Sequence, residues 1–180
     1  AVLSNSTPQI YLDGVALSAG TLITGTGTQE SFNNYHYYIG HVMSSSVYTF
    51  DGAIDNLMAF DRALTSTEIS SLANASDETV LASDSSLILH FKMNDNAGSS
   101  VVIDSSATVY NGTLKKQMKP DVIDSSAIAT TSSRNNITCN AIDLDGTNYV
   151  KTDSHIDLGD NYSYSLWICP DSISSSYTPL

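Results

Sequence analysis

Residues 50–73 read FDGAIDNLMAFDRALTSTEISSLA, and this stretch decides the fold. Residues 50–60 predict a strand that opens at an Asp-Gly turn, because Asp-Gly tolerates the positive φ angles of tight turns. Thr65 and Glu68 then have the spacing of a capping box, in which each side chain bonds an orphan backbone amide of the first helical turn. We therefore predict one short helix over residues 66–73.

The predicted helix is too short to be stable through its own propensity. Ile69 and Leu72 lie on one face of it, so we expect them to pack on the edge of a sheet. The chain on either side of the helix predicts short strands separated by turns. The expected strand segments are residues 9–17 (folded back at Asp13-Gly14), 35–39, 87–93, 101–103, 111–114, 141–144, 149–151 and 162–168.

Within residues 87–93 apolar and other side chains alternate, which predicts Leu87, Leu89, Phe91 and Met93 on one face of a strand. Residues 115–133 predict a polar connection without strands. Many short strands, frequent turns and one capped helix indicate an all-β sandwich.

The composition excludes two classes of partner. The 180 residues include 19 acidic and 7 basic side chains, a formal net charge of −12, and such a chain repels a phosphate backbone. We therefore expect no binding to nucleic acid. We also expect no membrane span, because no apolar run approaches the roughly 18 residues that a span needs. Charged residues make up only 14%, and abundant Ser, Thr, Asn and Tyr favour an extracellular or cell-surface location.

Two blocks of the sequence resemble a known family. Residues 10–14, 38–40, 50–56 and 61–69 resemble the C-terminal half of a laminin-G-like or pentraxin-like jelly roll of the concanavalin A-like class. Asp61 stands where the family usually has Asn, and Thr65 where it usually has Ser. The second block is similar to the N-terminal half of the same fold. It comprises residues 89–94, 104–106, 111–114, 142–146, 149–150 and 165–170.

The resemblance implies an antiparallel jelly-roll β-sandwich with its halves in reversed order. We assign residues 1–75 to a C-terminal half, residues 76–86 to a linker and residues 87–180 to an N-terminal half. The chain is then a window on a tandem array or a piece of a longer polypeptide, which we favour, or a circular permutant. A half-sandwich exposes an edge and an apolar face. We therefore expect neighbouring copies or adjacent domains to complete the strands.

The same class of fold includes glycoside hydrolases, which carry two Glu on one strand. The three glutamates of this chain, Glu30, Glu68 and Glu78, are far apart in sequence, and no Ser-centred elbow motif occurs. We therefore predict that the chain is not an enzyme. His36 and His41 flank Gly40 and are either surface strand residues or zinc ligands.

Calcium is the cofactor that the resemblance implies. The family often holds Ca²⁺ at the sandwich rim, and the matching carboxylates here are Asp51, Asp55 and Asp104. The other interpretation is that the Asp residues form turns, for which their short side chains are suited. Ala107 replaces the Gly that usually follows the Asp-Ser-Ser of the family, which changes the geometry of that loop.

Glycans are a second class of ligand, because ten Tyr could provide stacking platforms. Tyr35 and Tyr37 are expected on one face of a strand, either as sugar contacts or as packing partners. Trp167 matches a core position of the family, and we expect it to be buried.

Two covalent features are open to test. Cys139 and Cys169 either form one disulfide between strands or are separately buried thiols. Asn74 and Asn136 lie in Asn-x-Ser/Thr sequons in predicted loops and are candidate N-glycosylation sites. The function that we predict is adhesion, surface coating or assembly of a structural filament. The alternative is a carbohydrate-binding module of a larger secreted hydrolase.

Overall fold

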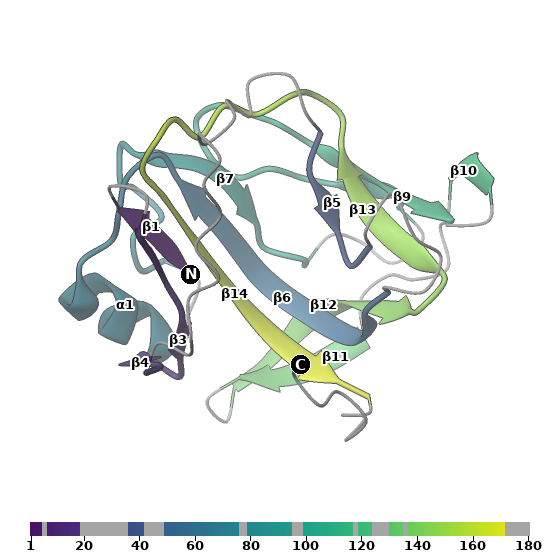
Figure 1. The fold of residues 1–180 in the computed structure, drawn as a ribbon. Helices are drawn as coiled ribbons and strands as arrows, with labels where there is room; N and C mark the ends of the chain where they lie inside the picture. Colours follow the sequence, from purple (N-terminus) through teal and green to yellow (C-terminus); the bar gives the residue numbers. More distant parts are fainter. Residues whose placement is uncertain are drawn as a thin grey trace, which may run out of the picture.

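The structure is a computed structural model. It describes residues 1–4, 7–18, 36–41, 49–75, 79–94, 99–116, 119–123, 130–134 and 137–171, of which Leu3 and residues 116–140 are described by their backbone alone. The strands are antiparallel and form two facing sheets with a small separate hairpin (Figure 1). This arrangement is the all-β sandwich that the sequence predicts.

The larger sheet has seven strands, in the order β11-β12-β6-β14-β1-β2, and β7 also pairs with β6. The strand β6 lies in its middle and is the longest. The bounds of the seven are β1 Val2–Ser4, β2 Thr7–Gln9, β6 Asp51–Phe60, β7 Leu87–Phe91, β11 Thr130–Arg134, β12 Ile137–Asp145 and β14 Tyr162–Pro170.

The smaller sheet has the order β10-β9-β13-β5, and β8 pairs with β9. Its strands are β5 Tyr38–Ile39, β8 Val101–Val102, β9 Gly112–Lys116, β10 Lys119–Ile123 and β13 Asn148–Thr152. The separate hairpin joins β3 Tyr11–Leu12 to β4 Val15–Ala16. Asp13 and Gly14 have φ angles of 49° and 79° at its turn, as the Asp-Gly pair predicts.

The main core lies between the two sheets. From β6 it takes Ile54, Leu57 and Ala59, which do not follow strict alternation. Asn56 has a φ of 49°, and the pairing of β6 with β14 shifts beside it between Ser165 and Trp167. This irregularity places one extra residue in β6 relative to β14, and it returns Leu57 to the inner face.

A second core lies on the outer face of the larger sheet, under the helix α1 (Ser66–Ala73). Met58, Phe60, Leu87 and Leu72 form it, with Leu64 at the start of the helix. Alternation predicted that Leu87 shares a face with Leu89 and Phe91. Leu87 lies on the opposite face instead. The pairing of β6 with β7 shifts between Ala59 and Phe60, and this shift turns Leu87 outward.

The capping box predicted for α1 is present. The backbone N–H of Glu68 donates to Thr65 Oγ1 at 3.3 Å, and that of Thr65 donates to Glu68 Oε2 at 2.7 Å. Leu72 is buried and Ile69 is half-buried against the second core, so packing fixes a helix that is only eight residues long.

The two halves of the chain form one sandwich. The strand β6 of the first half pairs with β7, β12 and β14 of the second half, and the main core takes residues from both. A circular permutant, one of the alternatives that the sequence left open, would have this arrangement. The assignment of the two halves to domains stays a prediction.

The linker predicted over residues 76–86 also stays a prediction, and the structure describes residues 79–86 of it. Val80 and Leu81 pack against the second core, and Asp84 forms an ion pair with Arg62 at 2.6 Å. Two further corrections concern local structure. Residues 115–133 contain β10 and most of β11, and Gly52 lies within β6 rather than in a turn.

Candidate functional site

A groove opens between the inner faces of the two sheets, where β5 faces β14. We call it the inter-sheet groove; its cavity has a volume of about 400 Å³. Its lining is mainly apolar and aromatic. It includes Tyr37, Tyr38, Ile39, Phe50, Tyr164, Leu166 and Ile168.

The side of the groove formed by β14 presents two aliphatic side chains to solvent. Leu166 is 43% exposed and Ile168 is 57% exposed, although both lie on the strand face that carries the buried core further along. Adjacent strands of a sandwich normally cover such side chains. Within the described part of the chain, Leu166 and Ile168 therefore form an exposed apolar strip along the groove.

The tyrosines are set against each other at the inner end of this strip. The ring centroids of Tyr37 and Tyr164 are 6.0 Å apart, and those of Tyr164 and Tyr162 are 5.5 Å apart. Burial raises the pKa of both Tyr37 and Tyr164. The Tyr37 hydroxyl approaches that of Tyr164 but makes no well-oriented hydrogen bond within the described part of the chain. Tyr37 thus packs in the lining of the groove with a buried hydroxyl, and its role as a sugar contact stays a prediction.

The ring of Tyr38 contacts residues of β13. Its ring lies 5.8 Å from that of Tyr149, and Lys151 Nζ lies 5.9 Å from its centroid. Gly40, with a φ of +85°, follows β5, and a Cβ there would collide with Leu144. The close approach of β5 to the core therefore requires a glycine. Tyr35, the other predicted sugar contact, lies outside the described residues.

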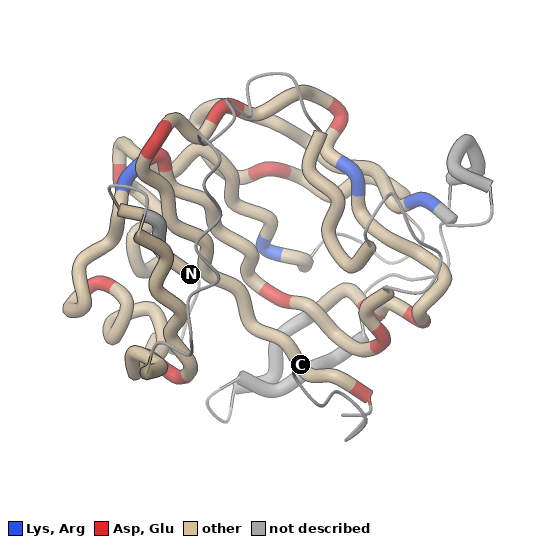
Figure 2. The backbone as a smooth tube through the Cα atoms, in the orientation of Figure 1, with Lys and Arg blue, Asp and Glu red and all other residues tan. Residues whose placement is uncertain are grey.

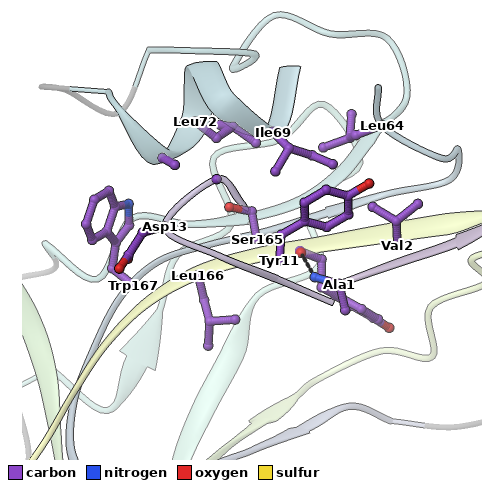
Figure 3. Close-up of a pocket in the computed structure, with 13 residues that line it drawn as sticks. Ala1, Val2, Tyr11, Asp13, Leu64, Ile69, Leu72, Ser165, Leu166 and Trp167 are labelled. Carbon is purple, nitrogen blue, oxygen red and sulfur yellow. Dashed lines mark hydrogen bonds between the residues drawn. The ribbon is translucent and has the colours of Figure 1, made fainter. Parts of the chain in front are cut away.

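A smaller pocket of about 130 Å³ lies on the outer face of the larger sheet, under α1 (Figure 3). Tyr11 lies across it, Ile69 and Leu72 line it from the helix, and Trp167 borders it near Asp13. The prediction that Trp167 is buried in the main core is wrong. It is half-buried on the outer face, because Tyr164, Leu166 and Ile168 of the same strand face inward and side chains alternate along a strand.

The three carboxylates predicted to bind calcium do not form a site. Both oxygens of Asp104 are used by the fold: Oδ1 accepts from the backbone N–H groups of His90 and Ser106 at 2.8 and 2.9 Å, and Oδ2 accepts from that of Tyr110 at 2.6 Å. Asp104 therefore closes the turn that follows β8, which is the alternative role that the sequence left open.

The other two carboxylates of that set lie apart on β6. Asp55 is buried within the strand, whereas Asp51 is exposed at its start, about 13 Å away at the usual rise per residue. No group of three metal-ligating side chains occurs among the residues that the structure describes.

Many acidic positions lie near strand ends and turns of the described backbone, and few positions in it are Lys or Arg (Figure 2). At one rim Asp51 pairs across strands with Asp145, and Asp143 lies two residues earlier on β12. The pKa of Asp143 is raised by burial and by the charges of Asp171, Asp51 and Asp145. This cluster repels itself at neutral pH.

The two histidines singled out by the sequence do not meet. His41 stacks on Tyr149, with ring centroids 5.0 Å apart. His36 instead contacts His155, which follows β13, with ring centroids 4.3 Å apart. No local sequence pattern predicts this pair, because the two residues are 119 positions apart (155 − 36) and the pairing of β5 with β13 brings them together.

The cysteine pairing is not formed. Cys169 is a free, exposed thiol on β14, and the side chain of Cys139 on β12 is outside the described residues. The strands β12 and β14 lie on opposite sides of β6, a separation of about 9–10 Å that exceeds the reach of a disulfide.

The structure describes one of the two candidate N-glycosylation sites, Asn74. Asn74 is exposed at the end of α1, where its Nδ2 donates to the Ser70 carbonyl at 2.8 Å. Asn136 lies outside the described residues, and glycosylation stays a prediction at both.

Comparison with known families gives a match for residues 1–70, to a laminin-G-type family described as Concanavalin A-like lectin/glucanases superfamily. Searches of curated proteins and of solved structures gave no significant match. The family match confirms the resemblance for the first block. Among the described residues, no helix has the length and apolar character needed to cross a membrane.

Proposed function

We propose that the chain is a non-catalytic extracellular binding module, because its first 70 residues match a family model of the concanavalin A-like lectin/glucanase superfamily and the chain folds as a β-sandwich. Its roles are adhesion, surface coating or assembly of a filament. The binding surface is the inter-sheet groove, and its partner is an extended apolar strand of a neighbouring module.

The observation that carries the proposal is the exposed strip of Leu166 and Ile168 inside the sandwich. Burial of apolar area contributes about 25 cal/mol per Å², so covering two such side chains favours association by about 1–3 kcal/mol. A strand laid along the groove would also contact the tyrosine rings of β5 and β14. Proteins recognise extended segments in this way when a sheet face or edge stays open.

A role without catalysis is supported by the position of Glu68. Its carboxylate accepts hydrogen bonds from Thr65 and is held by Arg62, so it serves the fold. The sequence offers only two other glutamates, neither of them close to it along the chain.

The test is a double variant, Leu166→Ser with Ile168→Ser, compared with Ile103→Ser with Val109→Ser. The control pair is 54% and 61% exposed and does not line the groove. Sedimentation at moderate salt, which screens the net charge, measures self-association. We expect the groove variant to associate at least about tenfold more weakly, with the control unchanged. Equal association of both variants and the parent would contradict the proposal.

Carbohydrate binding is the second candidate, because Tyr37 and Tyr38 offer aromatic rings in the groove of a fold whose superfamily includes lectins. A glycan array tests it directly. Selective binding that Tyr37→Ala removes would favour the lectin function, and an array without selective signals would favour adhesion through apolar strands.

A further inference from the structure

His36 and His155 form a pair on the smaller sheet that the proposed function does not use. Their ring centroids are 4.3 Å apart and their planes are inclined by 58°. His36 immediately precedes Tyr37 and β5, and His155 lies three residues after the end of β13. His155 is exposed and His36 is half-buried, so water and ions reach the pair.

One hydrogen bond selects the tautomer of the neutral His36 ring. Its Nδ1 lies 2.7 Å from the Thr152 carbonyl oxygen. A carbonyl oxygen only accepts, so Nδ1 carries the hydrogen, and in the neutral ring Nε2 then holds a lone pair. Histidines that bind metals commonly donate the other ring N–H to a backbone carbonyl, which fixes the tautomer and orients the ring. The neutral His36 ring therefore has the tautomer in which Nε2 can serve as a metal ligand.

The spacing of the rings also suits a shared ion. Metal–nitrogen bonds of about 2.0–2.1 Å put each ring centroid about 3.2 Å from the ion. Ligand angles between about 90° and 109° then put two centroids about 4.5–5.2 Å apart. The observed 4.3 Å needs a movement of a few tenths of an ångström, and the exposed His155 side chain has room for it.

We propose that His36 and His155 bind one divalent transition-metal ion of the zinc class, with water completing the coordination. Imidazole nitrogen suits zinc, copper and nickel, whereas calcium and magnesium prefer oxygen. The ion joins the segment that enters β5 to the loop that leaves β13. It thereby fastens β5, a two-residue edge strand that supplies Tyr38 and Ile39 to the inter-sheet groove.

The test uses the whole chain, freed of metal with a chelator and titrated with zinc in a calorimeter. We expect one zinc ion per chain and a rise in the melting temperature at saturating zinc. His36→Ala and His155→Ala should each weaken binding by at least about tenfold, since each removes one of two protein ligands. Calcium and magnesium, added instead of zinc, should give no such rise.

The matched control is His41→Ala, which removes a histidine of the same sheet that packs on Tyr149 instead. It should bind zinc as the parent does. Circular dichroism verifies that each variant is folded, and histidine NMR signals in the parent provide a readout without substitution. Zinc should shift the signals of His36 and His155 while those of His41 and His90 stay in place.

Three results overturn the proposal: no zinc binding by the parent, undiminished binding by both His36→Ala and His155→Ala, or an equal loss in His41→Ala. In each case the two rings are a packing contact alone. None of these results bears on the apolar strip of Leu166 and Ile168, so the proposed function is tested separately.

Discussion

The Arg62 guanidinium holds the Glu68 carboxylate with two hydrogen bonds, of 3.0 Å from Nη1 to Oε2 and 2.7 Å from Nη2 to Oε1. Glu68 is also the residue that caps α1 together with Thr65. A third bond, of 2.6 Å from Arg62 Nη2 to Asp84 Oδ2, reaches the segment that leads into β7. One arginine therefore joins the end of β6, the helix and the segment that leads into β7.

We predict that Arg62→Met lowers the free energy of unfolding by about 1–2 kcal/mol. Paired hydrogen bonds to carboxylates are stronger than neutral ones, but all three side chains are partly exposed, so water screens the attraction. Urea unfolding measures the change. Lys92→Met is the control, because it removes one positive charge from the segment after β7 outside this network, and it should cost less than about 0.5 kcal/mol.

The same network predicts how stability depends on pH. The Arg62 guanidinium lowers the pKa of Glu68 from 4.5 to about 2 and that of Asp84 from 3.8 to about 2. A carboxyl group with a lowered pKa stabilises the fold fully above its unfolded pKa, and this contribution is lost as the pH falls through the folded pKa. The contribution of Arg62 should thus be complete above pH 4.5 and disappear towards pH 2.

Urea unfolding of the parent and of Arg62→Met at a series of pH values checks this dependence. The difference between the two proteins should shrink as the pH falls through that window. A difference that stays constant down to about pH 2 would show that Arg62 acts through packing of its aliphatic stem instead.

The sequence predicted those parts of the fold that depend on neighbouring residues. The capping box of Thr65 and Glu68 and the turn at Asp13 and Gly14 are local, because the atoms that bond lie within a few positions. The alternation of residues 87–93 gave most of β7. It failed at Leu87, where the shift in pairing with β6 is set by a strand that lies distant in the sequence.

The candidate sites were harder to predict for the same reason. Asp104 has the right chemistry for calcium, but three backbone amides from separate positions surround it in the folded chain. The pair of His36 and His155 exists only once β5 has docked on β13. The sequence predicted Tyr37 as a candidate sugar contact. No local sequence pattern marked the exposed strip of Leu166 and Ile168.

Gly52 shows why an Asp-Gly pair can belong to a strand. Its φ is +137°, and a Cβ at this position would lie 2.6 Å from Pro170 Cα and 2.9 Å from the Asp171 nitrogen. These are backbone atoms that cannot move aside. We predict that Gly52→Ala destabilises the fold by about 2–4 kcal/mol, as measured by thermal or urea unfolding.

Gly159→Ala is the control for Gly52→Ala. Gly159 has a φ of +66°, but a Cβ there would meet nothing within 4 Å. Gly159→Ala should therefore lower the free energy of unfolding only through the strain of the positive φ, by about 1 kcal/mol. If both variants lost the same stability, the close approach of β14 to Gly52 would play no part.

The acidic rim leads to a stabilising substitution. Burial raises the pKa of Asp143, and the charges of Asp171, Asp51 and Asp145 raise it further. A carboxyl group whose pKa is raised in the folded state stabilises the fold only while it is protonated, and the benefit is lost as the pH rises through the folded pKa. The ionised form of Asp143 is repelled by the charges of these neighbours. Asp143→Asn removes that repulsion with little change of shape. We expect it to raise the free energy of unfolding at pH 7 by roughly 0.2–1 kcal/mol, the usual range for a cross-strand charge effect.

Urea unfolding at low and high salt checks the cause, because salt screens the repulsion and should reduce the gain. Asp153→Asn is the control. Asp153 Oδ1 accepts a hydrogen bond from Thr113 at 2.6 Å, so its replacement should give no gain.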